Sequence, residues 1–126
     1  MSIIDRSSVE HGKTYKIKPP VIDEAVYITI NDKEINGQLR PVEVFVNSKD
    51  MKSFQWISCL TRLISAQFRT NGPFPEFVVY ELLQTYDPKG GYVIPKTTIQ
   101  IPSIVAHIGW ILKNHCIELG VIKKDE

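Results

Sequence analysis

The sequence has few of the features that mark secreted, disulfide-rich or membrane proteins. Its 126 residues include two cysteines, Cys59 and Cys116, and these form no C-x-x-C pair. We therefore expect neither a disulfide framework nor a cysteine-rich zinc site. No run approaches the roughly 20 apolar residues of a membrane-spanning helix, and residues 1–18 contain no apolar core like that of a signal peptide. The expected compartment is the cytoplasm, without a membrane partner.

An excess of charge of one sign is also missing. Fifteen Lys and Arg residues balance 14 Asp and Glu residues, which gives a formal net charge of +1. Such a balance creates no strong long-range field, so nucleic acid is not an expected partner. The hydrophobic fraction of 43% and the charged fraction of 23% are typical of a globular domain. A chain of this length buries enough surface to fold without a metal or a disulfide.

Histidine and cysteine, which often act in catalysis, are present, but their spacing matches no known catalytic or metal-binding motif. The three histidines, His11, His107 and His115, match no usual metal-ligand pattern. His107 and His115 lie on one predicted helix, and we interpret His115 as a surface residue. Cys116 is interpreted as a core residue and Cys59 as a buried, inert thiol. We therefore expect no catalytic site, no metal site and no cofactor bound by this chain.

Alternating apolar residues predict an antiparallel sheet. Two runs have this pattern, with apolar positions at Val26, Ile28 and Ile30 and then at Val42, Val44 and Val46. Asn36 and Gly37 between the runs form a strong tight-turn signal, so residues 25–47 are predicted to form the main hairpin. Short strands are expected near 13–18 and 92–101.

Three helices are expected to cover the aliphatic face of this sheet. The first is predicted at about 49–70, capped by Ser48, because its apolar residues recur every three or four positions. These residues are Met51, Phe54, Ile57, Leu60, Leu63, Ile64 and Phe68. Residues 75–86 and 103–119 fit two further helices, and Gly120 suits the C-terminal cap of the last one.

The order of these elements predicts one domain of the α+β class. Strands come first and helices follow, which is typical of helices layered on an antiparallel sheet. No internal repeat or linker interrupts the pattern. We expect a loose N-terminal arm at 1–12, a single domain at 13–122 and a frayed tail at 123–126.

The turn at Lys89, Gly90, Gly91 and Tyr92 leaves two interpretations open. It can present backbone amides and a lysine to an anion. A stand-alone nucleotide or small-ligand sensor is therefore an alternative function. The two glycines also suit a plain turn that needs positive φ angles, and we favour this interpretation.

The first predicted helix carries cations and a tryptophan off its apolar stripe. This helix contains three cations spread along its length, Lys52, Arg62 and Arg69, and Arg40 precedes the second strand. Such a face either binds phosphates or an acidic partner, or is a solvated surface. Large aromatic residues off the apolar stripes, namely Tyr27, Phe45, Trp56 and Trp110, belong either to a second core or to a protein interface.

A series of short blocks resembles one known family. They include Gly12-Lys-Thr-Tyr-Lys-Ile-Lys18, Arg40-Pro-Val-Glu-Val-Phe-Val-Asn-Ser-Lys49 and Asp87-Pro-Lys-Gly-Gly-Tyr92, with further blocks at 26–32, 54–56, 60–62, 65–66, 68–69 and 102–103. They resemble the small protein encoded with split adenosylcobalamin-dependent (class II) ribonucleotide reductases. That protein is similar to the C-terminal TSCPD-type domain of the single-chain enzymes. The resemblance covers roughly residues 11 to 122.

This resemblance implies a role beside the large catalytic chain of the reductase, which holds the adenosylcobalamin, the substrate pocket and the radical-forming cysteine. The chain would be a non-catalytic accessory domain that binds this catalytic chain in deoxyribonucleotide synthesis. Reductase tails often carry a redox pair of cysteines, which Cys59 and Cys116 do not form by spacing. The candidate interface residues are Glu43, Asn47, Ser48, Trp56, Arg62, Arg69, Lys89, Gly90, Gly91 and Tyr92.

Two further alternatives stay open. A small sheet with an open edge invites pairing between copies, which favours a homo-oligomer. A repurposed interaction module, for instance a viral one that contacts a host factor, would have the same sequence features.

Overall fold

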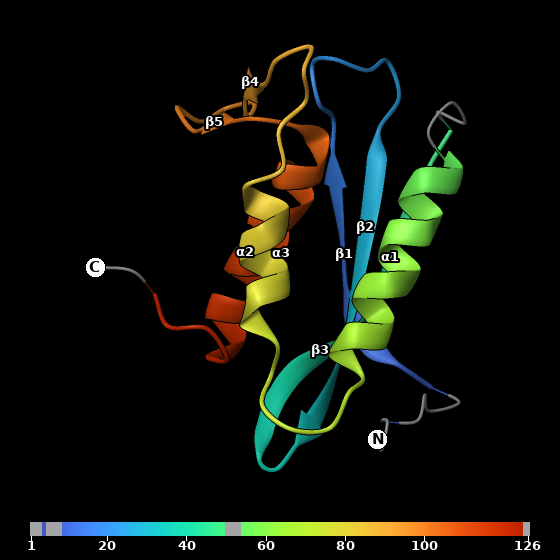
Figure 1. Ribbon diagram of the computed structural model, residues 1–126, viewed down its shortest axis with the longest axis vertical. Coiled ribbons are helices and arrows are strands. Elements are labelled where there is room, and N and C mark those ends of the chain that lie inside the picture. Colours follow the sequence, from blue (N-terminus) through green and yellow to red (C-terminus); the bar gives the residue numbers. More distant parts are fainter. Residues whose placement is uncertain (1–3, 5–8, 50–53, 125–126) are drawn as a thin grey trace.

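The computed structural model describes Ile4 and residues 9–49 and 54–124, and it has the predicted α+β fold (Figure 1). An antiparallel sheet in the order β1-β2-β3 is formed by β1 (His11–Ile17), β2 (Val26–Ile35) and β3 (Gln38–Ser48). The helices are α1 (Phe54–Phe68), α2 (Glu76–Leu83) and α3 (Ile104–Leu119). The strands predicted near 92–101 are β4 (Tyr92–Val93) and β5 (Gln100–Ile101), which pair in a separate two-stranded sheet.

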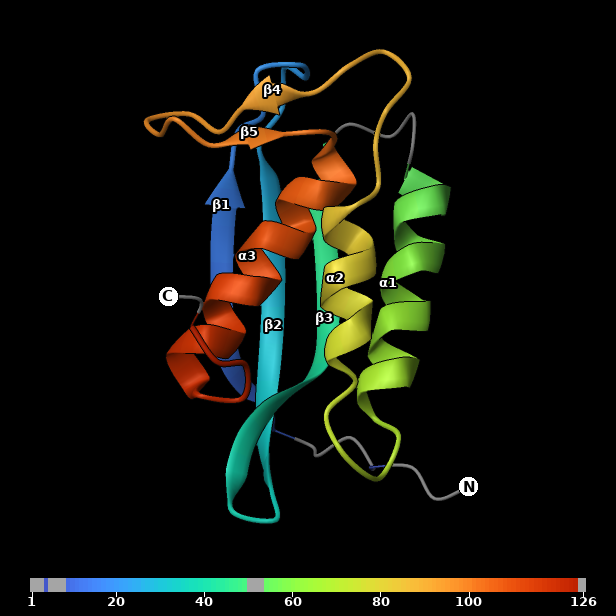
Figure 2. The same cartoon turned by 60° about the vertical axis from the view of Figure 1, so that its left-hand side comes forward.

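The helices are layered on the three-stranded sheet. Helices α2 and α3 lie side by side in front of the strands, and α1 runs alongside the edge strand β3 (Figure 2). The β4–β5 hairpin sits at one end, next to the start of α3. None of the described helices is long and apolar enough to cross a membrane.

The predicted hairpin turns at Asn36 and Gly37. Their φ angles are 52° and 83°, and two positive φ angles in succession are what a type I′ turn needs. Asn36 tolerates this conformation better than most residues with a side chain, and Gly37 adopts it without strain. The turn therefore fixes the register in which β2 and β3 pair.

The core lies between the sheet and the helices. Its largest cluster contains the predicted strand residues Val26, Ile28, Ile30 and Val44 together with Ile64, Phe68, Val79, Leu82, Ile108, Leu112 and Cys116 from the helices. Cys116 is thus a core residue, as predicted. Leu63, which its spacing assigned to the apolar stripe of α1, is 64% exposed. The next residue, Ile64, takes the position that faces the sheet.

The caps of α3 are as predicted. Ser103 begins α3 by accepting a hydrogen bond from the Ala106 N–H at 3.0 Å, and Gly120 ends it with a φ of 84°. Ser48 is the last residue of β3, and its hydroxyl donates to the Ala25 carbonyl at 3.0 Å. Its role as the cap of the first helix stays a prediction. Residues 50–53, where the predicted first helix would begin, lie outside the described residues.

The predicted N-terminal arm also falls largely outside the described residues. Within it, Ile4 is buried, and its backbone N–H donates to the Arg69 carbonyl at 2.7 Å. At the other end Lys123 and Lys124 are exposed, and 125–126 are not described.

Candidate functional site

The two histidines of α3 are buried, so the prediction of His115 as a surface residue was wrong. Each is 2% exposed because the face of α3 that carries it packs against another element. His115 lies between β1 and β2: its Nδ1 is 2.7 Å from the Tyr15 hydroxyl, and its Nε2 is 2.9 Å from both Asp32 carboxylate oxygens. Helical periodicity alone does not reveal such polar contacts in a core.

The Asp32–His115–Tyr15 series has the connectivity of a nucleophile–base–acid triad. Its chemistry is different, however. Burial raises the pKa of Tyr15 above its usual value, so the hydroxyl keeps its proton, whereas a nucleophile must lose its proton readily. The three residues come from β1, β2 and α3. We interpret the series as a polar clamp that holds α3 on the sheet.

His107 forms a second buried polar pair. Its Nδ1 is 2.7 Å from the hydroxyl of Tyr92, one of the candidate interface residues. Burial raises the pKa of Tyr92, so the hydroxyl keeps its proton and the two neutral side chains share one hydrogen bond. Tyr92 belongs to a second apolar cluster with Ile94 and Ile101, against which Trp110 packs. Trp110 is therefore a residue of this second core.

Stability at mildly acidic pH tests the burial of His107. Burial lowers the pKa of His107 below its usual value, so the unfolded chain takes up this proton first as the pH falls. The stabilisation is present above about pH 6.5 and is lost as the pH falls toward the pKa of the folded state. Between pH 7.5 and 5.5 we expect wild type to lose about 1 kcal/mol more unfolding free energy than His107→Gln. Urea titrations measure this, and equal losses would contradict it.

The cysteines do not form a redox pair. Cys116 is fully buried, and burial raises its pKa to about 12, so its thiol stays protonated. Cys59 is exposed on α1, which corrects its prediction as a buried thiol. Both are free. Among residues 4, 9–49 and 54–124, no group of three or more His, Cys, Asp and Glu side chains could hold a metal ion.

The Lys89–Gly90 turn uses its amides internally. The backbone N–H of Lys89 donates to the Asp87 carboxylate at 2.9 Å, and that of Gly90 donates to the Asp87 carbonyl at 2.8 Å. Gly90 has a φ of 100°, and Gly91 lies against the backbone of β5. The plain-turn interpretation accounts for both glycines. The amides that an anion would need already have an acceptor.

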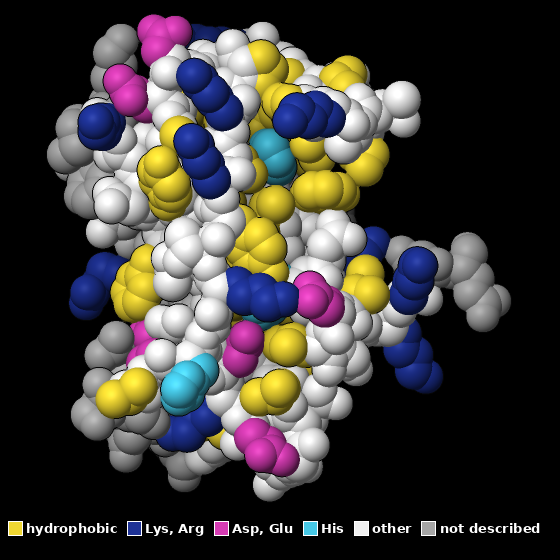
Figure 3. Space-filling view, turned by 180° about the vertical axis from the view of Figure 1, so that it is seen from behind, with side chains coloured by type: hydrophobic (Ala, Val, Ile, Leu, Met, Phe, Trp, Pro, Cys, Tyr) yellow, Lys and Arg dark blue, Asp and Glu magenta, His cyan; other side chains and the backbone are white. Residues whose placement is uncertain are grey.

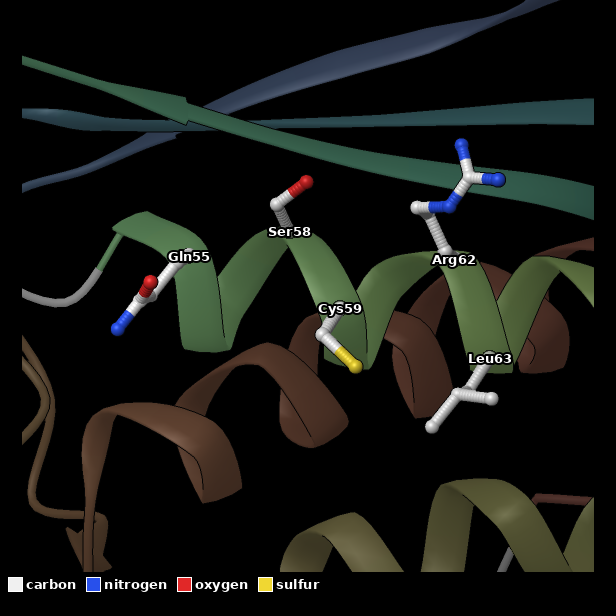
Figure 4. A pocket seen from close by; sticks show the side chains of 5 residues that line it. All are labelled: Gln55, Ser58, Cys59, Arg62 and Leu63. Atoms are coloured by element: carbon white, nitrogen blue, oxygen red, sulfur yellow. The ribbon is translucent and has the colours of Figure 1, made fainter.

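Helix α1 has an exposed apolar side. Trp56 is 72% exposed and Leu63 64% exposed, and Cys59 lies between them on the same side of the helix. A shallow groove of about 490 Å³ runs here, lined by Gln55, Ser58, Cys59, Arg62 and Leu63. In Figure 4, Cys59 and Leu63 point away from the sheet, whereas Ser58 and Arg62 point toward it.

A second groove separates α1 from β3. It has a volume of about 380 Å³, and its lining includes Phe45, Ser58, Arg62, Ser65 and Arg69. Within the described part of the chain Arg62 has no hydrogen bond or ion pair, and Arg69 Nε donates to the Ser65 carbonyl at 3.3 Å. Phe45, on the strand wall, is 47% exposed. The groove therefore combines uncompensated positive charge with an aromatic wall.

Ser65 holds α1 at the edge of the sheet. Its hydroxyl accepts from the Val44 N–H at 2.9 Å and donates to the Val44 carbonyl at 3.1 Å. One side chain thus satisfies two backbone groups that a further strand would otherwise bind. Because Ser65 is small, α1 comes close to β3 at this point.

The other candidate interface residues are dispersed. Glu43 is 1% exposed, and its Oε1 accepts from Asn31 Nδ2 at 2.8 Å, so it lies beneath the surface. Asn47 is exposed near the end of β3. The structure brings Arg62 and Arg69 together in one groove and places Trp56 on the outer side of α1. The Lys89–Tyr92 turn lies apart from them, beside the β4–β5 hairpin.

The back of the molecule has no large area of one charge. Figure 3 shows Lys and Arg side chains interspersed with Asp and Glu, and hydrophobic side chains that gather toward the β4–β5 end. Tyr27, at 42%, and Phe45 are both partly exposed. The aromatic residues that the sequence left between core and interface are thus divided, with Trp110 in a core and Trp56 at the surface.

The family model of the TSCPD domain matches residues 4–116. The match includes the three-stranded sheet, α1, α2, the β4–β5 hairpin and most of α3, and it confirms the resemblance to a TSCPD-type domain. No curated protein and no solved structure matches the chain at a significant level.

Proposed function

The chain belongs to the TSCPD-domain family, and from this membership we propose that it is an accessory domain that binds the catalytic chain of an adenosylcobalamin-dependent (class II) ribonucleotide reductase. It acts in deoxyribonucleotide synthesis and performs no chemistry of its own. The adenosylcobalamin belongs to the catalytic chain. The proposal rests on the order of the sequence blocks described above, which resembles the small protein of the split reductases.

The observation that carries the proposal is the outer side of α1. A tryptophan and a leucine, Trp56 and Leu63, are 72% and 64% exposed on one helix. Large apolar side chains exposed on the same side of a helix favour a protein interface, and tryptophan is among the residues that contribute most to binding energy. We propose this side of α1 as the main contact with the catalytic chain.

The polar groups of the interior also favour binding over catalysis. The imidazoles of His107 and His115 are engaged with the hydroxyls of Tyr92 and Tyr15, and the Cys116 thiol is held protonated by burial. Cys59 is exposed, but none of the hydrogen bonds or ion pairs of the described residues joins it to a base that would activate it. The two histidines and Cys116 are therefore held in structural contacts, and Cys59 lacks an activating base within the part of the chain that the structure describes.

Affinity purification tests the proposal. The tagged chain is expressed in the organism that encodes it, and co-purifying proteins are identified by mass spectrometry. We expect the class II catalytic chain in near-stoichiometric amount and a single complex on size-exclusion chromatography. A Trp56→Ala, Leu63→Ala double variant is the control, because it alters the exposed side of α1 without touching the core. Absence of the catalytic chain from the wild-type sample would refute the proposal.

A further inference from the structure

We propose that the groove between α1 and β3 docks an extended acidic segment of the partner chain. This inference rests on the proposed function, because it specifies which part of the partner the domain holds. It concerns the opposite flank of α1 from Trp56 and Leu63. The groove belongs to the free surface of the domain and is lined by residues of both elements.

Charge indicates the chemistry of the occupant. Arg62 has no ion-pair partner in the described chain, and the guanidinium of Arg69 uses its Nε for the Ser65 carbonyl. The described part of α1 contains no Asp or Glu at all. Two arginines on one flank therefore have no carboxylate partner within the described ranges of the domain. They favour a partner segment that carries carboxylates, because guanidinium groups bind carboxylates in a bidentate geometry.

The spacing of the arginines indicates the shape of the occupant. Arg69 lies seven positions after Arg62, which in helical geometry places them on the same side and about 10 Å apart along the axis. The Arg69 N–H still donates to the Ser65 carbonyl, so helical geometry persists to that residue. In a polyproline-II segment, residues i and i+3 point to one side and lie about 9 Å apart. Two acidic residues three apart therefore match the arginine pair.

The size of the groove favours an extended occupant over a helical one. A volume of about 380 Å³, spread over the roughly 10 Å between the arginines, leaves a cross-section of about 40 Å², whereas an α-helix with side chains is about 10–12 Å wide. A single extended chain fits this width. Phe45 on the strand wall offers an apolar contact for a residue between the two acidic positions.

Selection from a phage-displayed library of random 12-residue peptides tests this inference without using the reductase. We expect enriched peptides to carry two Asp or Glu residues three apart with an apolar residue between them. In fluorescence polarisation, an Arg62→Gln, Arg69→Gln double variant should bind the best peptide at least about tenfold more weakly than wild type. Trp56→Ala is the matched control and should bind it as wild type does.

Several outcomes would overturn the inference. Enrichment of peptides without acidic residues, no enrichment, or equal binding by the double arginine variant would each do so. Competition of the peptide by inorganic phosphate at equal affinity would make the groove a small-anion site. Self-association that the double variant abolishes would make the occupant a second copy. These outcomes do not test the proposed function, because the catalytic chain can bind through Trp56 even if the groove is empty.

Discussion

Replacing Arg40 with alanine is expected to lower the free energy of unfolding by about 3 kcal/mol, because hydrogen bonds from a buried charged donor are among the strongest in a fold. Arg40 is 3% exposed. Its guanidinium donates to the carbonyls of Phe68 and Gly72, at 2.7 and 2.8 Å, and more weakly to that of Thr70 at 3.3 Å. It also lies over the Phe74 ring, 5.4 Å from the centroid. One side chain of β3 therefore satisfies carbonyls at the C-terminal end of α1.

Urea unfolding measures this effect, and two variants control it. Arg40→Lys keeps the charge but loses the planar fork, so it should recover about half of the loss. Arg62→Gln removes an exposed arginine without partners and should change the unfolding free energy by less than about 0.5 kcal/mol. A loss below about 1 kcal/mol for Arg40→Ala would show that the carbonyls find other donors.

Gly91→Ala is expected to destabilise the domain by about 3 kcal/mol and to loosen the β4–β5 hairpin, because overpacking against backbone cannot be relieved by a side-chain movement. A Cβ at Gly91 would lie 1.9 Å from the Ile101 carbonyl oxygen and 2.8 Å from the Pro102 Cα. The backbone of β5 would have to move away. Tyr92, which pairs with Ile101, would move with it.

Amide hydrogen exchange localises this effect. The amides of β4 and β5 in Gly91→Ala should exchange faster than in wild type, while those of β2 keep their relative protection. Gly90→Asn is the matched control, because Gly90 has a φ of 100° and no atom within 4 Å of a Cβ, and Asn tolerates a positive φ. Wild-type stability of Gly91→Ala would contradict the assignment of the glycine to close packing.

The strands, the hairpin turn and the last helix could be predicted from local sequence. The period of two in β2 and β3, the Asn36–Gly37 turn, and the Ser103 and Gly120 caps each act through residues a few positions apart. The predicted start of the first helix falls on residues 50–53, outside the described residues, so its cap at Ser48 stays a prediction. Ser48 itself completes the β3 strand.

The buried polar residues could not be predicted, because their partners lie far away in the sequence. Arg40 has the composition of a surface cation, yet it is buried against carbonyls about 30 residues later. His115 finds Asp32 and Tyr15 from two different strands. Burial of such groups depends on tertiary contacts that no periodicity encodes.

The candidate site was partly predictable. The sequence placed Trp56, Arg62 and Arg69 on one helix outside its apolar stripe, and all three line or flank the exposed sides of α1. Glu43 and Tyr92 were also predicted as interface residues, but both are buried in the structure. The groove was not predictable, since it depends on how closely Ser65 draws α1 to the Val44 edge of β3.

Isothermal titration calorimetry of the purified chain against the purified class II reductase catalytic chain of the same organism tests the central claim most directly. We expect saturable binding by wild type, and binding at least about 30-fold weaker by Trp56→Ala, because an exposed tryptophan at an interface typically contributes 2 kcal/mol or more. The urea midpoint of this variant should match that of wild type. No heat of binding at micromolar concentrations, or equal affinity of the two proteins, would contradict the account.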